Sequence, residues 1–203
     1  MRGMARVSQE HLEARRRQIL QGAARCFARD GFHGTSMQDV FKETGLSAGA
    51  VYRYFPAKEA IIGALAHEVL DTVRGAFADA LASSRLPHPD EILSDALRRV
   101  ESVLRFPPPL VVQVWAESFR DERLAAVLRN VVSSLLDAWR EVVNGYIERG
   151  LIPPGTDPEA VARVLTACAQ GFMVQRALLG PLDHEMISAG VHGLTSFSAP
   201  ESA

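Results

Sequence analysis

The sequence contains only two cysteines, Cys26 and Cys168, and most of the chain separates them. Each lies within a helical pattern of apolar residues, so we interpret both as small buried side chains rather than a disulfide or a redox pair. No run approaches the roughly 20 apolar residues that a membrane-spanning helix needs. The first residues also lack the apolar segment of a signal peptide. These absences predict a soluble cytoplasmic protein.

The sequence also lacks the motifs of common catalytic sites. It contains no H-E-x-x-H pair, nucleophile elbow, phosphate-binding loop or dinucleotide fingerprint. Its six histidines are scattered, and the pair His184-Glu185 is too small to hold a metal ion, since ligand sets need more than two residues. We therefore expect no catalytic residues, no metal and no cofactor.

Period-two strand patterns are not evident, whereas apolar residues recur every three or four positions along the chain. The segment from Leu110 to Phe119 is rich in β-branched residues, but no partner strand exists elsewhere and the next segment is strongly helical. We predict an all-α chain in which residues 1–8 are disordered. The expected helices run from residue 8 or 9 to 30 and over 37–44, 48–54, 58–82, 90–106, 110–119, 121–149, 157–179 and 183–197.

The net charge of −2 conceals an uneven distribution. Residues 1–58 hold ten basic and five acidic residues, a net +5, and the remainder carries −7. A basic N-terminal segment joined to an acidic body is typical of a DNA-binding module fused to a second domain. We predict domains over residues 1–57 and 58–203.

Residues 35–58 have the pattern of two short helices joined by a tight turn. Thr35 and Gln38 have the spacing of a capping box at the start of the first helix. Gly45 follows the last periodic residue, as a helix-ending glycine does, and Ser47 is placed to cap the second helix. Pro56 disfavours helical geometry at the preceding residue. Helix, glycine turn and helix together predict a helix-turn-helix, whose second helix enters the DNA major groove.

The second of these helices has two distinct faces. Val51 and Phe55 lie four residues apart and are expected to pack inward, while Tyr52 and Arg53 fall on another face. Tyrosine and arginine are residue types that reach phosphates and base edges. Lys58 lies in the first turn of the next helix, where the helix dipole disfavours a cation. Two interpretations of Lys58 stay equally open, a phosphate contact and a solvated lysine.

The run G-F-x-G-T-S-x-x-D-V-x-x-x-T-G-L-S-x-G-x-V-Y-R-Y-F-P-x-K-E-A, from Gly31 to Ala60, resembles the DNA-binding domain of the TetR family of bacterial transcriptional regulators. The resemblance implies an N-terminal three-helix helix-turn-helix domain and a larger helical domain for ligand binding and dimerisation. It implies recognition-helix contacts from Ser47, Ala48 (through its backbone), Tyr52, Arg53 and Tyr54, and phosphate contacts from Thr35, Ser36 and Lys58. We expect Arg53 to be the main base-reading side chain, with guanine as its target.

The body contains aromatic residues that suit a small-molecule pocket, because pockets are mostly apolar with a few polar groups. A plain hydrophobic core is the alternative interpretation of the same residues. The resemblance implies an inducer bound inside this body. The candidate ligand-binding residues are Gln113, Trp115, Phe119, Trp139, Phe172 and Met173.

The last two long helices are apolar over a broad surface that includes Val161, Val164, Leu165, Cys168, Phe172 and Leu179. Such a helix must be buried in the core or against another subunit. The resemblance implies that both helices pair with their copies in a homodimer. We therefore expect a repressor that a small-molecule inducer releases from a palindromic double-stranded DNA operator. The alternatives are a constitutive DNA-binding protein without an inducer and an all-α carrier or enzyme.

Overall fold

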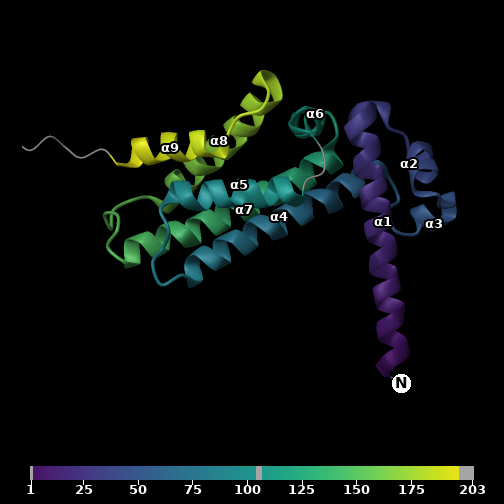
Figure 1. The fold of residues 1–203 in the computed structure, drawn as a ribbon, viewed down its shortest axis with the longest axis horizontal. Helices are drawn as coiled ribbons and strands as arrows, with labels where there is room; N and C mark the ends of the chain where they lie inside the picture. The colour runs from purple at the N-terminus through teal and green to yellow at the C-terminus, as the bar shows by residue number, and fades with distance from the viewer. Residues whose placement is uncertain (1, 104–106, 197–203) are drawn as a thin grey trace, which may run out of the picture. The chain divides into compact units, whose positions relative to one another are not determined.

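The computed structural model of the chain describes residues 2–103 and 107–196, with side chains from residue 9 onward. The described residues form helices, turns and loops without a strand, which confirms the all-α prediction (Figure 1). The helices are α1 (Arg2–Gly34), α2 (Met37–Thr44), α3 (Ala48–Tyr52), α4 (Lys58–Ala82), α5 (Pro89–Val103), α6 (Pro108–Ser118), α7 (Glu122–Glu148), α8 (Pro158–Leu179) and α9 (His184–Thr195).

Helix boundaries differ from the sequence-based expectation in two informative places. The helix α1 begins at Arg2, so the expectation of disorder up to residue 8 is wrong for the described residues. The helix α3 ends at Tyr52, two residues before the predicted end at Tyr54. The N–H groups of Tyr54 and Phe55 both donate to the Val51 carbonyl, which tightens the chain into a turn. The predicted end of α5 near residue 106 lies outside the described residues.

The chain divides into two compact units. The first unit takes residues 1–67 and 105–128, and the second takes residues 68–104 and 129–203. The start of α4, the helix α6 and the start of α7 therefore belong with the helix-turn-helix segment. The division of the chain into domains 1–57 and 58–203 stays a prediction.

The core of the first unit holds the three N-terminal helices together. Phe27 and Phe32 from α1 lie with their ring centroids 5.8 Å apart and are almost fully buried. They pack with Val40 from α2 and Val51 from α3. Burial of a side chain of this size contributes roughly 1.5–3 kcal/mol. The same cluster includes Ile19, Leu20, Ala23, Phe55, Ile61, Ile62, Leu65, Leu110, Val114 and Leu124.

The second unit has its own core, built from the later part of α4 and from α5, α7, α8 and α9. Trp139 from α7 is its largest member and lies 4.6 Å from Phe77 between ring centroids. The buried side of α9 contributes Val191, and α8 contributes Leu165 and Phe172. None of the described helices is both long enough and apolar enough to span a lipid bilayer.

Candidate DNA-binding site

A glycine breaks α1 just before the helix-turn-helix. Gly31 has φ 73° and ψ 172°, a conformation that side chains disfavour. The break lets Thr35 turn inward, where its hydroxyl donates to the Gly31 carbonyl at 2.8 Å and is almost fully buried. The Thr35 side chain thus stabilises the turn and has no free hydroxyl proton for a phosphate.

The helix α2 spans the predicted residues, but its capping box lies one position later than the sequence suggested. Ser36 is its N-cap, and its hydroxyl accepts from the Asp39 N–H, while the Asp39 carboxylate accepts from the Ser36 N–H at 2.9 Å. The predicted capping box of Thr35 and Gln38 is therefore wrong by one position, because Asp39 supplies the reciprocal acceptor. The hydrogen bonds from Ser36 hold the pKa of Asp39 below its usual value.

The turn between α2 and α3 has the predicted form. Gly45 ends α2 with φ 68°, in the left-handed region that glycine occupies without steric cost. Ser47 caps α3, and its hydroxyl accepts from the Ala50 N–H at 3.3 Å. Both predictions are confirmed, and together they fix the angle at which α3 leaves α2.

The helix α3 has one buried face and one open face, as its pattern predicted. Val51 is fully buried and Phe55 nearly so, which anchors α3 on the core of the first unit. Ala48 and Gly49 are exposed, and a side-chain atom added at Gly49 would meet nothing within 4 Å. Small residues on an open face allow another backbone to approach closely.

Tyr52 and Arg53 stand at the exposed end of α3. Tyr52 is 49% exposed, and its ring packs edge-on against Phe41 at 5.3 Å between ring centroids. Arg53 is exposed, and no described residue pairs with its guanidinium. Tyr54 is half-buried against the core of the same unit. Arg53, the C-cap residue of α3, is therefore a charged group free to bind an external acceptor.

Other arginines near this site are engaged within the protein. The Arg25 guanidinium bonds to Glu43 at 2.6 Å and Arg29 reaches Glu43 at 3.4 Å, which ties α1 to α2. Arg29 also pairs with its neighbour Asp30 at 2.9 Å. The hydrogen bond from Arg25 holds the pKa of Glu43 below its usual value. These arginines support the arrangement of α1 and α2.

Lys58 has a structural role that sequence reasoning missed. Its ammonium donates to the Phe32 carbonyl at 2.8 Å and to the Thr35 carbonyl at 3.3 Å, and it lies 4.3 Å from the Phe32 ring centroid. These carbonyls end α1 and enter the turn, where the partial negative charge of a helix C-terminus attracts a cation. An ammonium has three protons, so one is left for an external anion.

Replacing Lys58 with methionine is expected to lower the free energy of unfolding of the first unit by about 1–2 kcal/mol. Hydrogen bonds to charged groups contribute about 1.5–3 kcal/mol, and the half-exposed position reduces this. Urea unfolding followed by circular dichroism, without DNA, measures the change. Lys42→Met, at an exposed lysine on α2, is the matched control and should change stability little. Equal stabilities of Lys58→Met and wild type would contradict the role of Lys58 in the turn.

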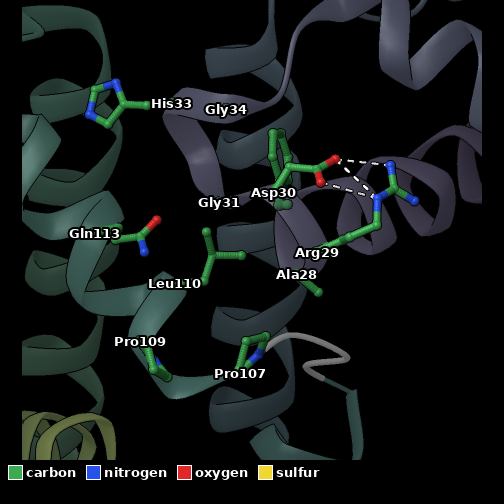
Figure 2. A pocket seen from close by; sticks show the side chains of 11 residues that line it. Ala28, Arg29, Asp30, Gly31, His33, Gly34, Pro107, Pro109, Leu110 and Gln113 are labelled. Atoms are coloured by element: carbon green, nitrogen blue, oxygen red, sulfur yellow. Dashed lines mark hydrogen bonds and ion pairs between the residues drawn. The ribbon is translucent and has the colours of Figure 1, made fainter.

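The helix α6 also contacts the backbone that leads into the helix-turn-helix. The Gln113 side-chain oxygen accepts from the Phe32 N–H at 3.3 Å, and Glu117 pairs with His33 at 2.8 Å. An open cavity of about 500 Å³ lies beside this junction, and Figure 2 shows Leu110 and Gln113 of α6 facing the end of α1 across it. Among the described lining residues, Gln113 is the one member of the predicted ligand set.

The structure distributes the predicted ligand-binding residues over both units. Gln113, Trp115 and Phe119 belong to the first unit, and Phe119 is 89% exposed. Trp139, Phe172 and Met173 belong to the second unit, where Trp139 and Phe172 are buried core residues and the partly buried Met173 packs against the same core cluster. The structure thus brings together these last three within one hydrophobic cluster.

The helices α8 and α9 leave large apolar side chains uncovered in the single chain. The apolar surface that the sequence placed on one broad face of α8 is divided: Leu165 and Phe172 point into the core, whereas Val164 and Leu179 are exposed. Helical spacing places the small residues Ala167 and Gly171 on the same side as Val164. The large apolar side chains exposed on the two helices are those of Val164, Leu178, Leu179, Met186 and Leu194.

The fold and this site define a helix-turn-helix DNA-binding protein. The family model described as "Bacterial regulatory proteins, tetR family" matches residues 19–65, and the model of the BetI-type transcriptional repressor C-terminal domain matches residues 109–194. The chain therefore belongs to the TetR family of bacterial transcriptional regulators.

Named relatives agree with this assignment. The chain is 34% identical to the HTH-type transcriptional repressor Rv1474c of Mycobacterium tuberculosis, over 80% of this chain and 95% of the relative. It is 32% identical to the repressor AcnR of Corynebacterium diphtheriae, over 78% and 92% of the two chains. The solved structure of Salmonella enterica GusR superposes with a TM-score of 0.72 at 29% identity, covering 89% of this chain and 95% of the other.

Proposed function

We propose that the protein is a homodimeric repressor that a small molecule releases from a palindromic operator. The observation that carries the proposal is the open face of α3, where Arg53 has no described partner and Ala48 and Gly49 let DNA approach. The names of the M. tuberculosis and C. diphtheriae relatives, both repressors, support the direction of regulation. The proposal gives the helical body a binding role and no catalytic role.

In this proposal, α3 lies in the major groove. Ser47 and the Ala48 backbone approach the DNA at the helix start, while Tyr52 and Tyr54 contact phosphates and Arg53 reads a guanine. The phosphate contacts of the preceding turn come from the remaining ammonium proton of Lys58 and from Ser36, whose hydroxyl must exchange its bond to Asp39 Oδ2, at 2.6 Å in the free protein, for one to the phosphate. The buried hydroxyl of Thr35 supports this turn and leaves at most a backbone contact for Thr35.

We further propose that α8 and α9 form the homodimer interface. Their exposed side chains Val164, Leu178 and Met186 would lose contact with water when two copies meet, and removal of apolar surface from water drives association. The small residues on the same side of α8 let two helices pack closely. A dimer presents two α3 helices to half-sites that lie about 34–36 Å apart, or a multiple of this, along the DNA.

Release by the inducer is a shift between two states of the dimer that differ in the spacing of their α3 helices. The inducer acts only as far as it binds one state better than the other. Two connections reach the DNA-binding segment: α4, which begins at Lys58, and α6, which contacts the Phe32 N–H through Gln113. We place the inducer in the second unit of the helical body, where the predicted contacts Trp139, Phe172 and Met173 share one hydrophobic cluster.

Selection of bound sequences from random DNA, followed by a screen for compounds that release the selected site, tests the whole proposal. A palindromic consensus is expected, together with at least one compound that lowers operator affinity. A ligand that binds tightly but leaves operator affinity unchanged would contradict the mechanism of release. Binding that shows no sequence preference would contradict the role of a specific repressor.

Replacing Arg53 with alanine is expected to weaken binding to the selected operator by about 1–3 kcal/mol and to relax specificity at one position. The physical reason is the loss of a bidentate contact to one base. Fluorescence anisotropy with the operator, with single-base variants and with random DNA measures the effect. Arg74→Ala, at an exposed arginine in the second unit, is the matched control. Equal losses on operator and random DNA would show that Arg53 contacts only phosphate.

A further inference from the structure

Two histidines and one aspartate from distant parts of the chain meet in the second unit. His88 and Asp90 lie at the start of α5, and His192 lies on α9. One ligand atom from each of the three side chains lies within 4.8 Å of the other two. The rings of His88 and His192 are 4.9 Å apart between centroids. Among the described residues, these three form the one cluster of side chains that could together hold a metal ion.

The backbone holds the first two ligands in place. The His88 N–H donates to the Glu91 carboxylate at 2.8 Å, and the Glu91 and Ile92 N–H groups donate to the His88 carbonyl, so His88 caps α5. Asp90 lies in the first helical turn and is almost fully buried. A buried carboxylate at this position requires partners, because an unpaired buried charge is strongly disfavoured.

The Nδ1 atoms of both histidines lie close to the same carboxylate oxygen of Asp90. Nδ1 of His88 contacts Oδ1 of Asp90, and Nδ1 of His192 lies 3.4 Å from the same atom. Two ligand atoms about 2.0–2.1 Å from a tetrahedral ion are about 3.3 Å apart, so His192 and Asp90 already have the required separation. His88 is one-third exposed, and a small rotation of its side chain would bring its Nδ1 to a similar distance.

The surrounding groups resemble the outer partners of a metal site. The other oxygen of Asp90 accepts from the Ser188 hydroxyl at 2.8 Å. Nε2 of His88 lies 3.3 Å from the Thr195 hydroxyl. Metal-bound histidines usually give their second ring nitrogen to a hydrogen-bond partner, and metal-bound carboxylates are themselves hydrogen-bonded. His192 is 61% exposed, which leaves a path for an ion from solvent.

We propose that His88, Asp90 and His192 bind one divalent transition-metal ion of the zinc, cobalt or nickel type. Two imidazoles and one carboxylate favour these ions over magnesium and calcium, which prefer oxygen ligands. Three protein ligands leave a fourth position for water or a small ligand. The ion joins the start of α5 to α9. The site does not depend on the proposed DNA or inducer binding.

The test is a titration of the chelator-treated full-length protein with zinc chloride by isothermal calorimetry, and with cobalt chloride by absorption spectroscopy. One zinc ion per chain is expected. The cobalt spectrum should show tetrahedral or five-coordinate ligand-field bands without a thiolate charge-transfer band. His192→Ala should weaken zinc binding by more than about tenfold, since even outer-shell changes cost 10–100-fold. The exposed position of His192 keeps this variant folded, as circular dichroism will verify.

His11→Ala, at an exposed histidine in the first unit, is the matched control and should bind zinc as wild type does. Ser188→Ala keeps all three ligands and should weaken binding less than His192→Ala. Three results would overturn the site: no stoichiometric zinc binding, equal affinity of His192→Ala and wild type, or a thiolate band in the cobalt spectrum. The first would show that the cluster is only a hydrogen-bonded clamp between α5 and α9.

Discussion

Replacing Leu178 with glutamate is expected to produce a folded monomer that has lost at least about 100-fold in operator affinity. Leu178 is 76% exposed on α8, so the single chain accommodates a carboxylate there. A two-fold interface would instead bury two such charges, and each unpaired buried charge is costly. A monomer engages one half-site at a time and loses the effective-concentration gain of a linked pair, which is typically 10²–10⁴-fold. Sedimentation velocity and anisotropy with the operator measure both effects.

Leu151→Glu provides the matched control for the interface. Leu151 is another exposed leucine, at 57%, but it lies in the turn after α7 and belongs to neither α8 nor α9. This variant should remain a dimer and bind the operator as wild type does. A dimeric Leu178→Glu protein with unchanged sedimentation would place the interface elsewhere. Dissociation of both variants would show that added charge alone, rather than its position, separates the subunits.

The helix-turn-helix could be predicted in detail because its signals are local. The glycine that ends α2, the serine that caps α3 and the inward pair Val51 and Phe55 all lie within a short stretch, and each acts on its immediate neighbours. The capping box was misplaced by one residue because Thr35 and Ser36 both suit an N-cap. Tertiary structure decided between them, since the Gly31 break turns the Thr35 hydroxyl inward.

The interactions that link distant segments of the chain have no local signal in the sequence. Lys58 bonds to the Phe32 carbonyl 26 residues away, and Gln113 meets the Phe32 N–H across 81 residues. Ser188 and Asp90 are 98 residues apart, so the cluster of His88, Asp90 and His192 has no spacing pattern for a reader of the sequence. The sequence places these residues in separate segments, and only the folded chain shows which segments meet.

The aromatic residues of the body show a second limit of sequence reasoning. A core and a ligand pocket use the same apolar side chains, so the pattern cannot separate them. The structure gives Phe119 and Trp139 opposite environments, one at 89% exposure and the other at 3%. Their difference reflects position: Phe119 is the C-cap residue after the short helix α6, whereas Trp139 lies in the middle of α7 against Phe77 of α4.

Replacing Trp139 with alanine is therefore expected to lower the free energy of unfolding by about 3–5 kcal/mol, since the cavity removes the contact with Phe77 and exposes core surface. Phe119→Ala, the exposed counterpart, should change it by less than about 0.5 kcal/mol. Urea unfolding followed by far-ultraviolet circular dichroism measures both. A small loss of stability in Trp139→Ala, combined with loss of inducer binding, would identify Trp139 as a pocket wall rather than a core residue. A large loss for Phe119→Ala would instead show that its ring is covered in solution.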